Sequence, residues 1–368
     1  MKKVVYDILR KIEEHNFKAY LVGGYVRDYL RKQENSDIDI CTNATPKDLL
    51  DIFKDYKVTL LDYGNIILNI DNLKFEITTF RKELSYKNNR KVVSIEYVNT
   101  YEEDILRRDF TINTICMDKD GNIIDLLNGK KDLHKKIIRS VGDPYFKMKE
   151  DSLRMLRAVR FACTLNFKLD NELKNAIVKN KDLLRKLSYE RKKEELNKIF
   201  TSDNKKYGIR LLKELNLEDV LELHDISNVL LTKDTIGIWA TIVKKNTYPF
   251  TRLEKELMRG VNELLNENIK DPMIMYKYGP YILSIVCDLK KLNKKKYLKM
   301  YDSLQIKERC EIKITSEEIC ELLNRKPGPF LKKIFDKLEK DLLENKVRNN
   351  NNEIKKYLFR IYNKEEMC

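Results

Sequence analysis

Asp37 and Asp39 are the two residues whose types and spacing point most directly to chemistry. They lie in the segment SDIDI, where polar and apolar residues alternate as they do along a β-strand. Side chains two positions apart on a strand leave the same face, with their Cα atoms roughly 7 Å apart. Two carboxylates on one face can share hard cations such as Mg²⁺, and paired metal ions suit in-line phosphoryl transfer. A lone Asp-x-Asp pattern, by contrast, usually marks a solvated strand edge.

Two adjacent glycines, Gly23 and Gly24, stand between a predicted short strand at 19–22 and a predicted helix. Because glycines have no side chains, the backbone N–H groups of such a turn can receive a triphosphate at the helix N-terminus. Arg27 lies on the first turn of that helix and can add a charge-assisted contact, and its neighbour Asp28 is expected to brace Arg27 or cap the helix. The glycines and the nearby carboxylates together indicate nucleotide chemistry far more specifically than either does alone.

Short motifs then follow one another in order along the chain. They are GGYVRD, DID, CTNATP, FEITTFR at 75–81, RRDFTIN at 107–113, DLLNGKKD at 125–132, EDSLRMLRAVRF at 150–161 and SYERKKEEL at 188–196. This order resembles that of the polymerase-β-like nucleotidyltransferases of the class II CCA-adding enzyme and bacterial poly(A) polymerase family. Beyond residue 200 the resemblance is faint, although GPFLKKIFDKLEKDLLENKV looks like the C-terminal helices of the family.

The resemblance implies transfer of CMP, CMP and then AMP from CTP and ATP to the tRNA 3′ end, with pyrophosphate release, Mg²⁺ and no nucleic-acid template. It also implies that Asp37 and Asp39 are catalytic metal ligands and that Gly24 and Arg27 bind the nucleotide. Three alternatives remain: a poly(A) polymerase, an enzyme that adds only CC or only A, and an inactive RNA-binding module. The segment at 80–98 resembles a full-length flexible loop of the family, which favours complete CCA addition, and the intact aspartates argue against an inactive module.

Further site residues are implied by the matching motifs. Glu76 lies on a predicted strand that should neighbour Asp37 and Asp39, so it is either a third carboxylate near the metals or a surface residue. Arg108 and Asp109, in the ribose-reading motif RRDFTIN, can contact a ribose hydroxyl and a phosphate. A contact with the 2′-hydroxyl is what separates ribonucleotides from deoxyribonucleotides.

The motif EDSLRMLRAVRF matches the nucleotide-selecting helix of the family. Asp151 and Arg154 are three positions apart, so a helix would project both from one face. Their carboxylate and guanidinium groups fit the amino group and ring nitrogen that cytosine and adenine share, whereas uracil and guanine reverse that pattern. Glu150 would orient Arg154, and Arg157 and Arg160 would continue the face toward the nucleotide. The alternative is an exposed helix with ordinary ion pairs.

The elements that must position these residues fall into two regions. Residues 19–125 indicate a sheet with helices packed on it, preceded by an amphipathic helix at 1–18. From residue 144 onward, apolar residues recur at helical spacing. The predicted fold class is therefore α+β, with a nucleotidyltransferase α/β head followed by an all-helical neck, body and tail. The predicted boundaries are 1–140 for the catalytic head, 141–200 for the nucleobase-selecting neck, 201–270 for the body and 271–368 for the tRNA-binding tail.

The charge of the chain is spread unevenly. Residues 1–150 carry 27 Lys and Arg against 25 Asp and Glu, whereas residues 151–368 carry 46 against 33. A basic surface of this size favours a polyanionic partner, and tRNA is the partner that the resemblance implies. A lysine-rich genome would also raise the lysine count, so charge alone does not decide between the two explanations.

Several classes of protein are disfavoured. No apolar run reaches the roughly 18–20 residues of a membrane span, and the charged N-terminus lacks the apolar core of a signal peptide. We therefore expect a cytoplasmic protein without a membrane partner. The seven cysteines have no C-x-x-C spacing and the three histidines are far apart, which predicts neither a zinc site nor a disulfide framework. The sequence indicates no protein partner.

Overall fold

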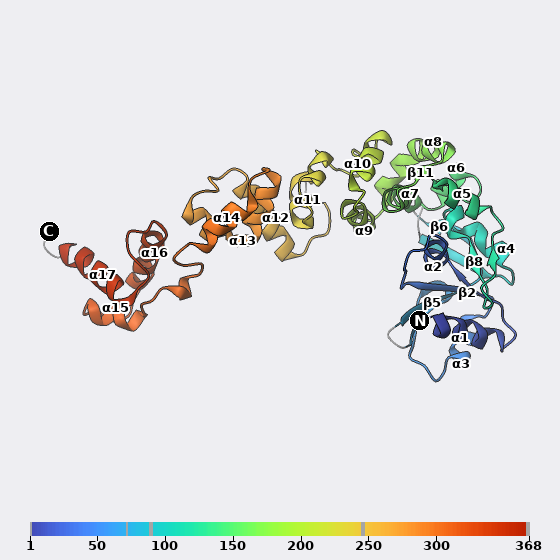
Figure 1. Ribbon diagram of the computed structural model, residues 1–368, viewed down its shortest axis with the longest axis horizontal. Helices are drawn as coiled ribbons and strands as arrows, with labels where there is room; N and C mark the ends of the chain where they lie inside the picture. Colours follow the sequence, from blue (N-terminus) through green and yellow to red (C-terminus); the bar gives the residue numbers. More distant parts are fainter. Residues whose placement is uncertain (1, 71–72, 88–90, 244–246, 366–368) are drawn as a thin grey trace. The chain divides into compact units, whose positions relative to one another are not determined.

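The structure is a computed structural model that describes residues 2–70, 73–87, 91–243 and 247–365. Its elements group into two compact units, Met1–His224 with Lys245–Pro249 and Asp225–Lys244 with Phe250–Cys368 (Figure 1). Each unit buries hydrophobic clusters of its own. Because each unit has a core, the two are described separately.

The first unit is built on a seven-stranded sheet. Its strands are β1 (Ala19–Val22), β2 (Ile38–Thr42), β3 (Val58–Leu60), β4 (Asn65–Ile70), β5 (Leu73–Thr79), β8 (Cys116–Met117) and β9 (Ile123–Ile124). Their order across the sheet is β3-β4-β5-β2-β1-β8-β9, with β2 parallel to β5 and antiparallel to β1. The register places Asp39 of β2 beside Glu76 of β5 and beside Val22 of β1. The candidate carboxylates and the strand that leads to the glycines are thus neighbours at the centre of the sheet.

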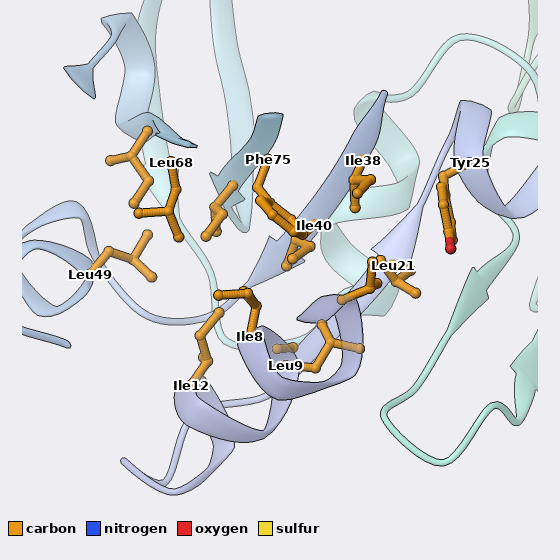
Figure 2. Close-up of a cluster of buried hydrophobic side chains, with 14 of the residues drawn as sticks. Ile8, Leu9, Ile12, Leu21, Tyr25, Ile38, Ile40, Leu49, Leu68 and Phe75 are labelled. Atoms are coloured by element: carbon orange, nitrogen blue, oxygen red, sulfur yellow. The ribbon is translucent and has the colours of Figure 1, made fainter. Parts of the chain in front are cut away.

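Hydrophobic packing determines which face of β2 carries the chemistry. Two helices, α1 (Lys2–Glu13) and α3 (Pro46–Ile52), contribute Ile8, Leu9, Ile12 and Leu49 to one core (Figure 2). Ile38 and Ile40 of β2 are buried in the same core, and complete burial of such a side chain contributes roughly 1.5–3 kcal/mol. Because side chains alternate along a strand, Asp39 between them must face the opposite side of the sheet.

The strand predicted at 19–22 is confirmed as β1, and Glu76 lies on a strand, β5, as predicted. The strand predicted over SDIDIC begins instead at Ile38, so Asp37 immediately precedes β2. A local hydrogen bond from the Asp37 N–H to Oδ1 of Asn35, at 2.9 Å, occupies the backbone there. The segment 80–98 forms the hairpin of β6 (Arg81–Lys87) and β7 (Lys91–Tyr97). Residues 88–90 of that predicted loop lie outside the described residues.

Helices make up most of the remainder of the first unit. The helix predicted over 1–18 ends earlier, at Glu13. A short parallel pair, β10 (Ile137–Ile138) and β11 (Lys168–Leu169), interrupts the helical region that was predicted from residue 144. The other helices are α2 (Gly24–Leu30), α4 (Tyr101–Asp104), α5 (Gly129–Lys135), α6 (Pro144–Glu150), α7 (Leu153–Leu165), α8 (Asn171–Asn180), α9 (Tyr189–Phe200) and α10 (Lys205–Glu214).

The second unit is helical throughout its described elements. They are α11 (Thr235–Ile242), α12 (Arg252–Leu264), α13 (Pro272–Leu289), α14 (Lys294–Asp302), α15 (Ser316–Leu322), α16 (Phe330–Leu343) and α17 (Asn351–Glu365). α13 is kinked at Gly279, which has a φ of 71° and is followed by Pro280. A proline inside a helix is expected to cause such a kink, because it has no N–H to donate to the preceding turn. The segment Lys-Pro-Gly-Pro at 326–329 lies between α15 and α16.

The α+β fold class is confirmed, with an α/β sheet region followed by helices. Within the described part of the chain, we find no helix with the length and apolar character that crossing a membrane requires. The finer division into head, neck, body and tail at 140, 200 and 270 remains a prediction.

Candidate active site

A cavity of about 440 Å³ opens in the first unit at the start of β2. Its lining is dominated by charged side chains from segments far apart in the sequence. The lining residues are Gly23, Gly24, Arg27, Asn35, Asp37, Asp39, Glu83, Arg107, Arg108, Asp109, Asn113, Asp151, Arg154, Arg157, Arg160 and Phe161. The fold therefore brings together every predicted site residue except Glu76.

The two glycines allow the backbone to approach the carboxylates closely. Gly23 has a φ of +70°, a conformation that favours glycine, and a Cβ placed there would lie 3.1 Å from Oδ2 of Asp39. A Cβ on Gly24 would lie 3.3 Å from Nδ2 of Asn35. Side chains at these positions would occupy the space between α2 and β2. The glycines thus leave room for a ligand next to Asp39.

The carboxylates at the start of β2 concentrate negative charge. Burial and the charge of Glu76 raise the pKa of Asp39 to about 6, although Arg108 opposes this shift. Asp37 also raises it and is itself exposed. Paired carboxylate oxygens are the ligands that Mg²⁺ prefers, and a cation between them would relieve their repulsion. Asp37 and Asp39 therefore suit a divalent cation in both donor type and electrostatics.

Glu76 lies beside Asp39 in the register but outside the cavity lining. Its Oε1 accepts a hydrogen bond from Nδ2 of Asn65 at 3.2 Å. Among the described residues, no three His, Cys, Asp or Glu side chains are grouped so that they could hold a metal ion. The structure thus places Glu76 close enough to act on Asp39 through its charge and does not draw it into a three-carboxylate cluster.

Arg27 is held by three hydrogen bonds where α2 borders the cavity. Its Nε and Nη2 donate to the two carboxylate oxygens of Asp28 at 3.0 and 2.7 Å, and its Nη1 donates to Oδ1 of Asn113 at 2.9 Å. The expectation that Asp28 braces Arg27 is confirmed. Bidentate pairing fixes a planar guanidinium before any ligand arrives, which preserves binding energy for the ligand itself.

Asp109 and Arg157 form a second ion pair, in which one carboxylate oxygen accepts both hydrogen bonds. Nε and Nη2 of Arg157 donate to Oδ2 of Asp109 at 2.9 and 2.6 Å, and Nδ2 of Asn113 donates to Oδ1 of Asp109 at 3.0 Å. Burial would raise the pKa of Asp109, but Arg157 and these hydrogen bonds outweigh burial and lower it to about 2. The carboxylate is therefore ionised at neutral pH and ties the RRDFTIN motif to α7.

The predicted helix carrying both Asp151 and Arg154 is wrong in one respect. Asp151 lies in the junction between α6 and α7, with φ −135° and ψ 101°, so the two residues do not share a helical face. Oδ1 of Asp151 accepts from the N–H of Leu153 at 3.0 Å, which ends one helix and starts the next. The fold nevertheless brings both side chains to the cavity.

Arg154 is almost fully buried and held by three acceptors. Its Nη1 donates to Oε2 of Glu150 at 2.8 Å and to the carbonyl of Lys147 at 3.1 Å, and its Nη2 donates to the carbonyl of Arg107 at 2.8 Å. The expectation that Glu150 orients Arg154 is confirmed. The orientation of this guanidinium is therefore set by α6, which contributes two of the acceptors, and by the segment that contains Arg107.

The ring of Phe161 lies amid three cavity arginines. The guanidinium carbons of Arg160, Arg27 and Arg157 lie 4.0, 5.4 and 5.5 Å from its centroid. Arg160 also donates from Nε to Oε2 of Glu195, on α9, at 2.6 Å. Cation–π contacts and an ion pair thus order the far end of the arginine row.

Five lining residues were not among the predicted site residues: Asn35, Glu83, Arg107, Asn113 and Phe161. Arg107, Asn113 and Phe161 belong to the motifs RRDFTIN and EDSLRMLRAVRF, so those motifs could have identified them. Asn35 and Glu83 had no comparable signal, because a loop and the β6 strand bring them to the site through the fold.

Comparison with known families covers most of the chain. Residues 19–139 match the poly A polymerase head domain, residues 166–226 match the RNA and SrmB-binding site of polymerase A, and residues 251–358 match tRNA nucleotidyltransferase domain 2. Three consecutive matches of this kind cover both units.

Whole-chain relatives are CCA-adding enzymes. The chain is 32% identical to that of Anoxybacillus flavithermus over 98% of both proteins, and 33% identical to that of Ligilactobacillus salivarius over 94% of this chain and 93% of the relative. The crystal structure of the Bacillus stearothermophilus CCA-adding enzyme in complex with CTP matches with a TM-score of 0.81 at 26% identity, covering 99% of this chain and 98% of that one. The Thermotoga maritima enzyme complexed with tRNA, at 21% identity over 98% of this chain and 95% of that one, has a TM-score of 0.73 and supports the fold alone. With this identity along nearly its whole length, the chain belongs to the class II CCA-adding enzyme family of nucleotidyltransferases.

Proposed function

We propose that this nucleotidyltransferase adds CMP, CMP and AMP from CTP and ATP to the 3′ end of tRNA, releasing pyrophosphate and using no nucleic-acid template. One observation carries the proposal: a single cavity is lined by the paired aspartates, the glycine turn and the Asp151 and Arg154 side chains. The likeness to CCA-adding enzymes along the whole chain supports it.

We infer that Mg²⁺ is the cofactor and that Asp37 and Asp39 hold it. Their oxygens suit a hard cation, and the pKa of Asp39, raised to about 6, indicates unrelieved negative charge at this position. When bound, Mg²⁺ would lower the pKa of the attacking 3′-hydroxyl and neutralise charge on the triphosphate and the leaving pyrophosphate. Glu76 lies beside Asp39 and acts on the site through its negative charge, which raises the pKa of Asp39. Whether Glu76 also binds the metal is tested by its replacement with glutamine.

The remaining cavity residues bind and orient the nucleotide. Gly24 and Arg27 receive the triphosphate, since the glycine leaves the backbone accessible and the arginine is already fixed by Asp28. Arg108 and Asp109 contact the ribose and a phosphate. Arg157 and Arg160 line the same wall and add positive charge toward the triphosphate.

Base selection is assigned to Asp151 and Arg154. Cytosine and adenine each place an amino donor next to a ring-nitrogen acceptor, so one carboxylate and one guanidinium can serve both. Uracil and guanine place a carbonyl where the amino group would be and a ring N–H where the acceptor would be. Each mismatch leaves a desolvated polar group unpaired, at a cost of about 1–3 kcal/mol.

We assign binding of the RNA substrate to the basic part of the chain, residues 151–368. Residues 151–368 carry 46 Lys and Arg against 33 Asp and Glu, and residues 166–226 match an RNA-binding region of polymerase A. Such a surface neutralises phosphates and releases counterions. We infer that the enzyme works on tRNA in the cytoplasm.

The test is a nucleotide-addition assay with tRNA transcripts that end before CCA, after C and after CC. Each is incubated with Mg²⁺ and CTP, ATP or both, and product lengths are read at single-nucleotide resolution. Complete CCA ends formed only with both nucleotides on the transcripts that end before CCA or after C, and with ATP alone on the transcript that ends after CC, support the proposal. A long A tail would indicate a poly(A) polymerase, products stopping at CC or requiring a CC end would indicate a partial enzyme, and RNA binding without addition would indicate an inactive module.

A further inference from the structure

Each of the six arginines that line the cavity is paired with a carboxylate. The pairs are Arg27–Asp28, Arg107–Asp104, Arg108–Asp104, Arg154–Glu150, Arg157–Asp109 and Arg160–Glu195. Asp104 occurs twice in this set although it lies outside the cavity lining. We propose that Asp104 is a positioning residue for the nucleotide, holding Arg107 and Arg108 in place and acting through them on Arg154. The inference rests on the proposed function, because it requires that the cavity bind a nucleoside triphosphate.

The contacts of Asp104 divide between its two oxygens. Oδ1 accepts from Nε of Arg107 at 2.8 Å and from the backbone N–H of Arg81 at 3.2 Å. Oδ2 accepts from Nη2 and Nε of Arg108 at 2.8 and 3.2 Å. The side chain is 0% exposed, at the C-terminal end of α4. A buried carboxylate with this many donors holds both guanidinium groups from outside the cavity lining.

The electrostatics keep this carboxylate ionised. Burial would raise the pKa of Asp104, but the charges of Arg108 and Arg107 outweigh burial and lower it. In turn, Asp104 raises the pKa of Arg108 although burial of that guanidinium acts in the opposite direction. Because both partners are removed from water, loss of the carboxylate charge would leave two buried cations without their main acceptor.

The base-facing side of the cavity depends on the same segment. Arg154 donates from Nη2 to the carbonyl of Arg107 at 2.8 Å, although 47 positions separate the two residues in sequence. The five-residue stretch from Asp104 to Arg108 therefore fixes Arg108 by its side chain and Arg154 by a backbone carbonyl. A change at Asp104 should consequently affect nucleotide affinity and base choice together, without touching the nucleotide.

Asp104→Asn tests this inference because the amide has the size of the carboxylate but presents N–H groups to guanidinium N–H groups. We expect KM for CTP and for ATP to rise about tenfold or more, while KM for tRNA stays within about twofold. The preference for CTP over UTP should fall at the same time. A general loss of stability would instead lower the amount of active enzyme without changing KM for the nucleotides, KM for tRNA or the preference for CTP over UTP.

Asp132→Asn is the matched control. Asp132 is also a buried carboxylate of the first unit, and its oxygens accept from Oγ1 of Thr111 at 2.8 Å and from Nε of Arg139 at 3.1 Å, but it lies outside the cavity lining. This variant should lose thermal stability comparably and keep KM for CTP near that of the wild type. If Asp104→Asn and Asp132→Asn behave alike in KM and in base preference, the inference is overturned.

Two further variants keep the result interpretable. Combining Asp104→Asn with Arg108→Ala should raise KM for CTP by clearly less than the product of the two single increases, since the part of the Asp104 effect that passes through Arg108 is already lost when Arg108 is gone. Fully additive increases would overturn the inference. If Asp104→Asn does not fold, Asp104→Glu keeps the charge and displaces it by one methylene, and an unchanged KM for CTP would then count against the inference. A wild-type protein that adds no nucleotide would instead contradict the proposed function.

Discussion

The two sides of the candidate active site differ in how their charges are balanced. On the arginine side, Asp109 accepts two hydrogen bonds from Arg157, and its pKa falls to about 2 despite burial. On the carboxylate side, burial and the neighbouring charge of Glu76 raise the pKa of Asp39 to about 6. On the arginine side, the protein thus neutralises the charges with its own ion pairs. On the carboxylate side, neighbouring negative charges repel one another.

This difference separates two tasks. Paired arginines are fixed before the nucleotide arrives, so little conformational entropy is lost on binding and the recognition geometry is preorganised. Crowded carboxylates are unfavourable in the protein alone, and a divalent cation would make them favourable. We propose, on this basis, that nucleotide recognition is built into the fold and that catalysis requires an added divalent cation.

The largest effect should come from removing the carboxylates of the unbalanced side. Asp39→Ala, and separately Asp37→Ala, should lower kcat on the order of 1,000-fold or more, because metal-assisted stabilisation of the transition state contributes several kcal/mol. Binding of tRNA, measured by filter retention, should stay close to wild type, since these groups serve the metal and not the RNA. Substantial activity at saturating Mg²⁺ in either variant would remove the two-aspartate assignment.

Removing the base-facing groups should alter selectivity more than rate. In the double variant Asp151→Ala, Arg154→Ala, we expect the preference for CTP and ATP over UTP and GTP, as kcat/KM ratios, to fall about 10–100-fold. The aspartates and the glycine turn stay in place, so chemistry should continue. A variant that loses rate and keeps the wild-type ratios would show that selection lies elsewhere.

The carboxylates of Asp39 and Asp109 should have opposite effects on the stability of the metal-free protein. The folded-state pKa of Asp39, about 6, lies above the unfolded value of roughly 3.9, so the charged group destabilises the fold as pH rises from about 4 through 6. Asp39→Asn should therefore raise Tm by about 2–5 °C at pH 7.5 and change it little at pH 4.

Asp109→Asn should do the reverse. The pKa of Asp109, about 2, lies below the unfolded value of roughly 3.9, so its stabilising contribution is present above pH 4 and is lost as pH falls toward 2. Its replacement should lower Tm at pH 7.5, and by less at pH 3. Calorimetry of both variants across this pH range measures the contrast, and shifts of the same sign at pH 7.5 would contradict it.

The smallest effect is expected for Glu76. Glu76→Gln removes a negative charge next to Asp39, so the site attracts a cation less strongly. The Mg²⁺ concentration that gives half-maximal activity should therefore rise only about 3–10-fold, and kcat at saturation should stay within about threefold. A Mg²⁺ titration of activity provides both quantities. If kcat at saturating Mg²⁺ fell by orders of magnitude, Glu76 would be a direct metal ligand.

Local patterns were sufficient to predict most of the site. Alternation along SDIDI placed Asp39 on a strand, and the chain order of the motifs indicated that Arg27, Arg108 and Arg157 would meet near it. In the structure, all four residues line the same cavity. Each of these inferences needed only spacing within a few residues or the succession of short motifs.

The rest depended on contacts that local sequence does not encode. Helical spacing continues across 150–161, yet the Asp151 side chain binds the backbone of the next helix and divides the segment in two. Glu83 reaches the cavity from a hairpin, and Asp104 acts from beneath it. Their positions follow from packing between segments, which no periodic pattern in the sequence reports.

The pairing of Arg160 with Glu195 has a consequence for how such a site can change over evolutionary time. Both side chains are largely withdrawn from solvent, and they come from α7 and α9, 35 positions apart. A single substitution at either position leaves the partner's charge buried without a counter-ion, which lowers the free energy of unfolding by about 3–5 kcal/mol. That is a large share of the margin by which a domain stays folded. Substitutions at these two positions are therefore expected to occur as coordinated double changes, so that α7 and α9 evolve as a unit.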